Sequence, residues 1–266
     1  MLVEQIWTAN NYRNFNYLIA CSETGEPLAI DPLDSEKCLT IAKKMGWEIT
    51  QILNTHHHHD HIDGNQAVVD ATGAKVIAHA QANEQIPGMD IGVSAGDVVK
   101  VGKSVELEAL DTPGHTMSHI CLYYEGSDTE MPALFCGDTL FNAGVGRCDF
   151  GGEPSILHKT FEEQIFLLSD SVRIYPGHDY IENNLEFTLD REPDNQSAKK
   201  LRDKFKSGLD AESFISDIGL EREINVFFRL DEHQVRVGIA DSLKIDVNSL
   251  DRQKTFICLR GLRDNW

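Results

Sequence analysis

Positive charge is scarce in this sequence. Its 266 residues include 24 lysines and arginines against 43 aspartates and glutamates, and the formal net charge is −19 at pH 7. Proteins that bind nucleic acid or anionic membranes use clustered Lys and Arg to neutralise phosphate groups. The composition therefore argues against both kinds of partner, and we expect no nucleic acid and no membrane to bind.

Leader-like and membrane-spanning segments are missing as well. The start of the chain carries no basic stretch, and no later run approaches the roughly twenty apolar residues that a membrane helix needs. The 6 cysteines are dispersed without a C-x-x-C pair, in a chain long enough to build a core without disulfides. We therefore expect a cytoplasmic protein with reduced thiols, and we take it to be a monomer.

The balance of charged residues and the local hydrophobic pattern of the sequence both change near residue 180. Residues 1–180 hold 26 acids and 10 bases, for −16, whereas residues 181–266 hold 17 acids and 14 bases, for −3. Before this point short β-rich runs alternate with helical stretches, and after it the pattern is helical without a convincing strand. The sequence thus predicts an α/β chain with two domains, over residues 1–180 and 181–266.

Hydrophobic periodicity and turn residues locate the elements of both domains. The predicted strands cover residues 16–21, 27–31, 48–54, 74–78, 105–111, 119–124, 133–136 and 172–175. The predicted helices cover residues 34–45, 64–72, 155–168, 183–189, 196–206, 231–242 and 251–264.

Four of the predicted strands run into histidine or aspartate. The strand over 48–54 continues into the run T-H-H-H-H-D-H at residues 55–61, and three later strands lead to His115, Asp138 and His178, each directly after a glycine. A packed core has no reason to repeat this arrangement, and α/β folds place their chemistry at the carboxyl ends of strands. The pattern indicates a functional site.

Imidazole and carboxylate together suit Zn, Fe or Mn. His56 and His58, two residues apart on an extended loop, can reach one ion, and Asp60 and His61 then project toward another position. Seven candidate ligands exceed what one tetrahedral zinc with an open position accepts, so we predict two divalent metals per chain, zinc first and iron or manganese as alternatives. The predicted ligands are His56, His58 and His115 for one metal, Asp60, His61 and His178 for the other, and Asp138 as the bridge.

A histidine run can also be present without binding a metal. A purification tag or a solvated loop fits poorly, because the run is internal and Asp60 and His61 follow it. His57 and His59 alternate with the predicted ligands, so we expect them to point away from the metals. The remaining histidines receive no role.

The strand ends form an ordered set of motifs. T-H-x-H-x-D-H at 55–61 is followed by G-H at 114–115, G-D at 137–138 and G-H at 177–178. In these motifs the chain resembles the metallo-β-lactamase-fold hydrolases. The resemblance implies an αββα sandwich with the metals at one edge, and it assigns the seven ligands in the same way.

Five further motifs extend the resemblance over nearly the whole chain. They are T-P-G-H-T at 112–116, G-D-T-L-F at 137–141, G-H-D-Y at 177–180, N-N-L at 183–185 and L-R-G-L-R-D-N-W at 259–266. They are most similar to glyoxalase II, the hydroxyacylglutathione hydrolases. The resemblance makes residues 1–180 the catalytic domain and residues 181–266 a helical substrate-binding domain.

The same resemblance implies an activity. Members of the family hydrolyse glutathione thioesters, such as S-lactoylglutathione to D-lactate and glutathione, with a hydroxide that bridges two metals. Asp60 and Asp138 would act in catalysis through those metals. Arg260 and Arg263 lie three residues apart on a predicted helix and share a face, although such a pair is also typical of a solvated helix end. The implied contacts to glutathione are Arg147, Asp179, Tyr180, Arg260 and Arg263.

Some positions depart from the family pattern. Cys148-Asp149-Phe150 stands where an aromatic pair is usual, so an acid occupies a position expected to contact glutathione. Residues 144–150 and 177–180 also resemble persulfide dioxygenases, and a glutathione persulfide dioxygenase with one iron is the alternative function. The N-N-L motif and the final eight residues argue against it. A binding module that metals merely stabilise is a third reading, disfavoured by two complete ligand sets.

Overall fold

The computed structural model describes residues 1–266, which form two compact units. The first unit comprises residues 1–112, 118–137 and 175–178, and the second comprises residues 113–117, 138–174 and 179–266. No single cut near residue 180 separates these units, because residues 138–174 cluster with the later helices. The boundary between a catalytic domain over 1–180 and a helical domain over 181–266 stays a prediction about the family domains.

The first unit contains a six-stranded sheet in the order β1-β2-β3-β4-β5-β6. Its strands are β1 (Leu2–Trp7), β2 (Phe15–Ala20), β3 (Pro27–Ile30), β4 (Gln51–Leu53), β5 (Lys75–His79) and β6 (Ile91–Val93). β1 to β3 are antiparallel, whereas β3 to β6 run parallel. Because β3 and β4 run in the same direction, their carboxyl ends lie side by side at one edge of the sheet.

A second sheet has the order β13-β10-β9-β8-β7. Its strands are β7 (Val98–Val101), β8 (Val105–Asp111), β9 (Ile120–Tyr124), β10 (Ala133–Gly137) and β13 (Arg173–Pro176). The pairs from β7 to β10 are antiparallel. β8, β10 and β13 are three of the strands that lead into the predicted site motifs.

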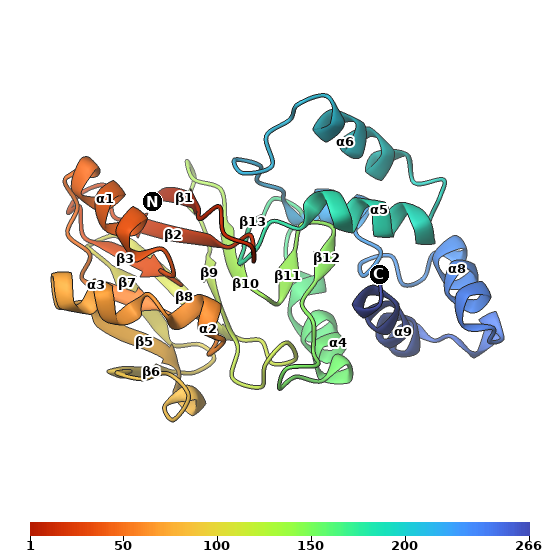
Figure 1. Cartoon of the computed structure of the whole chain (residues 1–266), viewed down its shortest axis with the longest axis horizontal. Helices are drawn as coiled ribbons and strands as arrows, with labels where there is room; N and C mark the ends of the chain where they lie inside the picture. The colour runs from red at the N-terminus through yellow and green to blue at the C-terminus, as the bar shows by residue number, and fades with distance from the viewer. The chain divides into compact units, whose positions relative to one another are not determined.

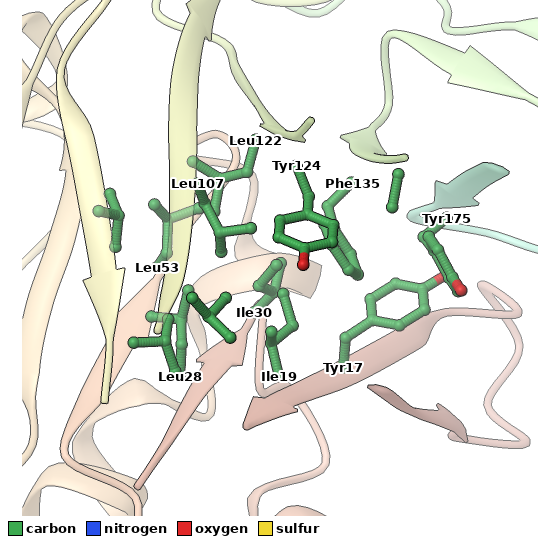
Figure 2. Packing of buried hydrophobic residues seen from close by; sticks show 14 of the residues in the cluster. Tyr17, Ile19, Leu28, Ile30, Leu53, Leu107, Leu122, Tyr124, Phe135 and Tyr175 are labelled. Atoms are coloured by element: carbon green, nitrogen blue, oxygen red, sulfur yellow. The ribbon is translucent and has the colours of Figure 1, made fainter. Parts of the chain in front are cut away.

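The main core of the first unit lies between the two sheets. Tyr17 and Ile19 of β2 point toward side chains of the other sheet, among them Phe135 and Tyr175, as Figure 2 shows. The Phe135 and Tyr175 rings stack with centroids 4.7 Å apart, and the Tyr17 ring meets Phe135 edge to face. Leu18, between the two core residues of β2, faces the other side of its sheet, as the alternation of a strand requires.

That other side is covered by helices (Figure 1). Cys38 and Ala42 of α1 (Ser35–Met45) and Val68 of α3 (Asn65–Thr72) pack in one cluster with Leu18 and Ile52. The α1 helix starts where the Asp34 side chain accepts the Lys37 N–H, and it ends at Gly46, whose φ is 71°. A short 3-10 helix, η1 (Ala80–Ala82), follows β5.

The second unit is mainly helical and contains one short hairpin. The hairpin pairs β11 (Leu140–Phe141) with β12 (Gly144–Val145). None of the helices in either unit combines the length and apolar character needed to span a bilayer. The helical elements are α4 (Pro154–Glu163), η2 (Ile165–Leu167), α5 (Ile181–Arg191), α6 (Gln196–Lys206), α7 (Ile218–Ile224), α8 (His233–Leu243), η3 (Val247–Ser249) and α9 (Arg252–Asp264).

Most of the predicted elements are confirmed. Every predicted strand is present, and no strand follows residue 180. The helix predicted over 155–168 was too long, because the backbone leaves the helical region at Gln164, with φ of −136°. The elements β1, β6, β7, α2 (His59–Ile62), α7 and the hairpin were not predicted, because they are short or lie at sheet edges.

Truncation of Phe135 to alanine tests the inter-sheet core. Phe135 is 1% exposed, so the cavity left by its ring should lower the free energy of unfolding by about 3–5 kcal/mol. Urea denaturation followed by circular dichroism measures this, with Leu167→Ala as the control because Leu167 is 74% exposed. Equal stability of the two variants would contradict this packing.

Candidate metal centre and substrate pocket

The histidine motif leaves β4 as an extended segment and then turns into a helix. His58 caps α2 (His59–Ile62) from an extended conformation, with φ of −65° and ψ of 144°. The extended backbone expected for the His56 and His58 pair is found at His58, and Asp60 and His61, for which no backbone form was predicted, lie on the helical turn. The turn places both of these side chains inward, and both are buried.

Asp60, His61 and His178 form one group of potential ligands within the first unit. The Nε2 atoms of His61 and His178 are 3.2 Å apart. The Asp60 Oδ2 atom lies 3.7 Å from the first of them and 3.5 Å from the second. All three ligand atoms lie within 4.8 Å of one another, so a single ion can be reached by all of them.

The contacts of the outer ring nitrogens indicate which nitrogens of these imidazoles can bind a cation. His61 Nδ1 lies 2.9 Å from Asp31 Oδ2, and His178 Nδ1 lies 2.7 Å from the Tyr12 carbonyl oxygen. Both partners only accept hydrogen bonds, so each Nδ1 carries the proton. In a neutral ring of this tautomer Nε2 carries the lone pair, and both Nε2 atoms lie beside the Asp60 carboxylate. A divalent cation fits this donor set, because it attracts all three ligand atoms.

Hydrogen bonds also indicate which ring nitrogens of His56 and His58 face each other. The Thr55 hydroxyl donates to Asp31 Oδ2 at 2.7 Å, so it accepts from His56 Nδ1 at 3.1 Å. His56 Nε2 lies 3.0 Å from His58 Nδ1. The two residues thus offer neighbouring nitrogens to an ion, as their spacing predicts.

In the second unit His115 and Asp138 form a further pair. His115 Nδ1 donates to the Arg147 carbonyl oxygen at 2.6 Å, and its Nε2 atom lies 3.5 Å from Asp138 Oδ2. Glycine is required beside His115, because Gly114 has φ of 139° and a Cβ there would lie 2.4 Å from the Leu157 Cα. Substitution at this glycine would displace the ligand.

Asp31 is a site residue that the sequence reasoning missed. It is buried directly after β3, and its carboxylate accepts from the Thr55 N–H, the Thr55 hydroxyl and His61 Nδ1. Its φ of 46° is unusual for a residue other than glycine. A signal was present, since Asp31 is one more acid at the end of a parallel strand. Asn14 has a comparable role, because its amide donates to Asp60 Oδ2 at 3.2 Å.

The alternate histidines make other contacts. His57 Nδ1 lies 3.5 Å from the Ser118 hydroxyl, and burial together with the neighbouring His58 lowers the pKa of His57. His59 Nε2 lies 3.3 Å from the exposed Tyr12 hydroxyl. Neither residue belongs to a group of potential metal ligands.

A cavity of about 290 Å³ lies within the second unit. Four of the five residues predicted to contact substrate line it, namely Arg147, Tyr180, Arg260 and Arg263. The fifth, Asp179, does not line it: it is buried, and its Oδ1 atom accepts the Ile181 N–H at the start of α5.

Arg147 is held by the unexpected acid of the motif. Its Nε and Nη2 atoms donate to the two carboxylate oxygens of Asp149 at 3.0 and 2.5 Å. These bonds lower the pKa of Asp149 and raise that of Arg147. The Cζ atom of the same guanidinium lies over the Phe150 ring, 5.2 Å from the ring centroid. Asp149 therefore orients the arginine, although both side chains remain partly exposed and the pair adds little to stability.

The two arginines of α9 differ in their surroundings. Arg260 is 2% exposed, and its Nη1 atom donates to the carbonyl oxygens of Val145 and Gly146 at 2.6 and 3.2 Å. Its Nη2 atom lies 3.0 Å from Asp264, and burial lowers its pKa. Arg260 thus lines the cavity as the resemblance implies, but its guanidinium is bound largely to the protein itself.

Arg263 keeps its charge available to the cavity. Its Nε and Nη2 atoms donate to the neutral amide oxygen of Asn184 at 3.2 and 3.1 Å. Trp266 lines the cavity beside these residues. The pocket thus offers one arginine bound to an amide and one bound to an exposed carboxylate, a suitable arrangement for an anionic ligand.

Replacement of Asp31 by asparagine tests how the first ligand group is oriented. The amide would turn a donor toward His61 or Thr55, so metal affinity should fall about 10–100-fold. Competition with a chromogenic chelator and elemental analysis measure affinity and metal per chain. Asp63→Asn is the control, since Asp63 is exposed just beyond the motif. Unchanged affinity in a folded D31N protein would contradict this role.

Two family models match the chain. The metallo-beta-lactamase superfamily model matches residues 17–205, and the model of the hydroxyacylglutathione hydrolase C-terminus matches residues 179–266. These matches confirm the expected fold class, a metallo-β-lactamase sandwich followed by a smaller helical domain.

Individual relatives agree over the whole chain. The hydroxyacylglutathione hydrolase of Nitrosococcus oceani is 55% identical and that of Polaromonas sp. is 57% identical, each over 266 residues and 100% of both chains. The crystal structure of ETHE1 from Myxococcus xanthus covers 99% of this chain and 100% of its own, with a TM-score of 0.67 and 24% identity, and shares the fold. On the full-length identities and the two models, the chain belongs to the hydroxyacylglutathione hydrolase family of the metallo-beta-lactamase superfamily.

Proposed function

We propose that this enzyme hydrolyses glutathione thioesters, with S-lactoylglutathione as substrate and D-lactate and glutathione as products. The observation that carries the proposal is the arginine-lined cavity, found in a chain at least 55% identical over its full length to proteins named hydroxyacylglutathione hydrolase. A glutathione thioester is a small anionic molecule, and Arg147 and Arg263 are suited to bind its carboxylates.

The proposal includes two divalent metals per chain, held by the seven predicted ligands. Zinc is the expected metal, and iron or manganese fits the same nitrogen and oxygen donors. Metals bound there would supply a water of near-neutral pKa as nucleophile and would polarise the thioester carbonyl. Support comes from three of the predicted ligand imidazoles, whose Nδ1 atoms each face an oxygen acceptor, so that Nε2 is the ring nitrogen left to bind a metal.

The protein groups orient the reaction. Asn14 donates to the Asp60 carboxylate, and Asp31 accepts from His61 Nδ1, so that Nε2 is the ring nitrogen left to bind a metal. Asp60 and Asp138 would act in catalysis by holding the metals and so the attacking water. The leaving group is a thiolate, which is a weak base and departs readily, so little help from a general acid is needed.

The cellular location and the oligomeric state are also part of the proposal. Cytoplasmic residence is supported by the six cysteines, all free thiols in the structure. A monomer remains the expected assembly. The partner is a small molecule, and no nucleic acid is expected.

The alternative, a glutathione persulfide dioxygenase with one iron, is less supported. The C-terminal family model over residues 179–266 and the full-length relatives both carry the hydroxyacylglutathione hydrolase name. A 24% identical solved structure shows the fold alone.

An S-lactoylglutathione assay with metal quantification on the same sample tests the function. We expect loss of thioester absorbance, release of glutathione and two metals per chain. Oxygen uptake and sulfite production from glutathione persulfide, with one iron per chain and no thioester turnover, would establish the alternative instead.

Replacement of Arg263 by alanine tests the pocket. Loss of a charge-assisted contact that substrate and transition state share should raise KM about tenfold or more, with little change in kcat. Steady-state kinetics measure both constants. Arg202→Ala is the matched control, because Arg202 lies on α6 and is absent from the cavity lining. A lower kcat with an unchanged KM would show that Arg263 does not bind the substrate.

A further inference from the structure

One wall of the arginine pocket is held by a buried carboxyl group. Glu221 of α7 is fully buried, and its Oε2 atom accepts from the Ala143 N–H at 2.8 Å and from Asn225 Nδ2 at 3.0 Å. Its Oε1 atom lies 2.7 Å from the Ser216 hydroxyl. None of these partners is positively charged, which is unusual for a buried acid.

The group that Glu221 binds is the turn of the β11–β12 hairpin. Ala143 has φ of 58°, a left-handed conformation that an alanine rarely adopts without support. The neighbouring Asn142 carbonyl oxygen accepts from Asn184 Nδ2 at 2.9 Å, and the Gly144 carbonyl oxygen accepts from Asn225 at 3.2 Å. The polar groups of the turn are therefore bound to buried side chains.

The hairpin turn also shapes the arginine-lined cavity. Phe141 and Val145, on either side of it, line the cavity. The Val145 carbonyl oxygen accepts from Arg260, and Asn184, which binds the turn through its amide nitrogen, accepts from Arg263 through its amide oxygen. A displacement of the hairpin would therefore move the contacts that orient both arginines.

The hydrogen-bond partners indicate where the proton of this network lies. The Ser216 hydroxyl is 2.7 Å from Glu221 Oε1 and 3.0 Å from Asn142 Oδ1, and it has one hydrogen to donate. A protonated Glu221 donates to Ser216, which then donates to Asn142, and every group has a partner. Ionised Glu221 would need the hydroxyl hydrogen for itself, and the Asn142 amide would have to turn over to keep a bond.

The charges around Glu221 favour the protonated form. Burial raises the pKa of Glu221 from 4.5 to about 7, which its hydrogen bonds from Ser216, Asn225 and Ala143 only partly offset. The charged group that acts on it is Asp217, which raises the pKa further. The hairpin residues 140–145 include no titratable side chain, and the α5 residue in the network is a neutral asparagine.

We propose that Glu221 is a positioning residue for the glutathione moiety of the substrate: its carboxyl group fixes the Asn142–Ala143 turn, and the turn fixes Arg260 and Arg263. The inference rests on the proposed function, since it concerns the pocket that would bind glutathione. It adds a residue of α7 that lines no part of the cavity and acts through its neighbours.

Two substitutions at Glu221 separate its shape from its charge. Glu221→Gln retains an acceptor for Ala143 and Asn225 and offers an N–H to Ser216, as the protonated carboxyl does. Glu221→Ala removes all of these bonds. Glu223→Ala is the matched control, because Glu223 is an exposed residue of the same helix.

The expected result is a change in KM rather than in kcat. E221A should raise KM for S-lactoylglutathione about tenfold, as expected when a buried hydrogen-bonding group is lost, whereas E221Q and E223A should keep the wild-type KM. Partial unfolding would lower kcat through the folded fraction and leave KM unchanged. An unchanged KM in a folded E221A protein would overturn the proposal.

The pH dependence provides the second measurement, and it decides the matter if E221A does not fold. Glu221 is neutral below about pH 7 and ionised above it, so wild-type KM should rise between pH 6 and about 8.5, and E221Q should lack that rise. Because the folded pKa exceeds the ordinary value of 4.5, wild-type Tm should also fall relative to E221Q as the pH increases from about 4.5 to about 7, and the difference should be constant above that. Parallel pH profiles would overturn the proposal. A wild-type enzyme without thioester turnover would instead refute the proposed function.

Discussion

The candidate metal centre depends on hydrogen bonds to the nitrogens that face away from it. His61, His178 and His115 each donate an Nδ1 proton to an oxygen that only accepts, so their Nε2 atoms keep lone pairs for a cation. Without these acceptors each ring could adopt the other tautomer or rotate. The surrounding strands serve this requirement, because β3 and β4 end side by side and bring Asp31 to the Thr55 backbone.

The pocket of the second unit follows a different principle. Its arginines are bound to oxygen atoms of the protein before any ligand arrives: Arg260 to main-chain carbonyls, Arg263 to Asn184, and Arg147 to Asp149. Preorganised cations lose little side-chain entropy when a ligand binds. The cost is competition, most directly at Arg147, where a substrate carboxylate must share the guanidinium with Asp149.

Much of this was predictable from the sequence, since glycine beside histidine or aspartate at strand ends is a local signal. Three of the seven candidate ligands follow such a glycine and the other four lie in the histidine run after β4, whereas the expected substrate contacts came from the family resemblance. Asp31, Asn14 and Glu221 were not, because their roles arise from partners that lie far away in the chain and meet only in the fold. The bonds of Arg260 to main-chain carbonyls were unforeseen for a related reason: helical spacing shows which side chains share a face, but not which carbonyl groups lie opposite.

The hydrogen bond from His115 to the main-chain oxygen of residue 147 means that the backbone and the side chain of that residue are under different evolutionary constraints. His115 is held by the main-chain oxygen of residue 147, whereas the side chain of that residue lines the cavity. His178 is likewise held by the main-chain oxygen of residue 12. Every amino acid supplies such an oxygen, so both side chains can change under selection for a different substrate while the metal ligands keep their orientation.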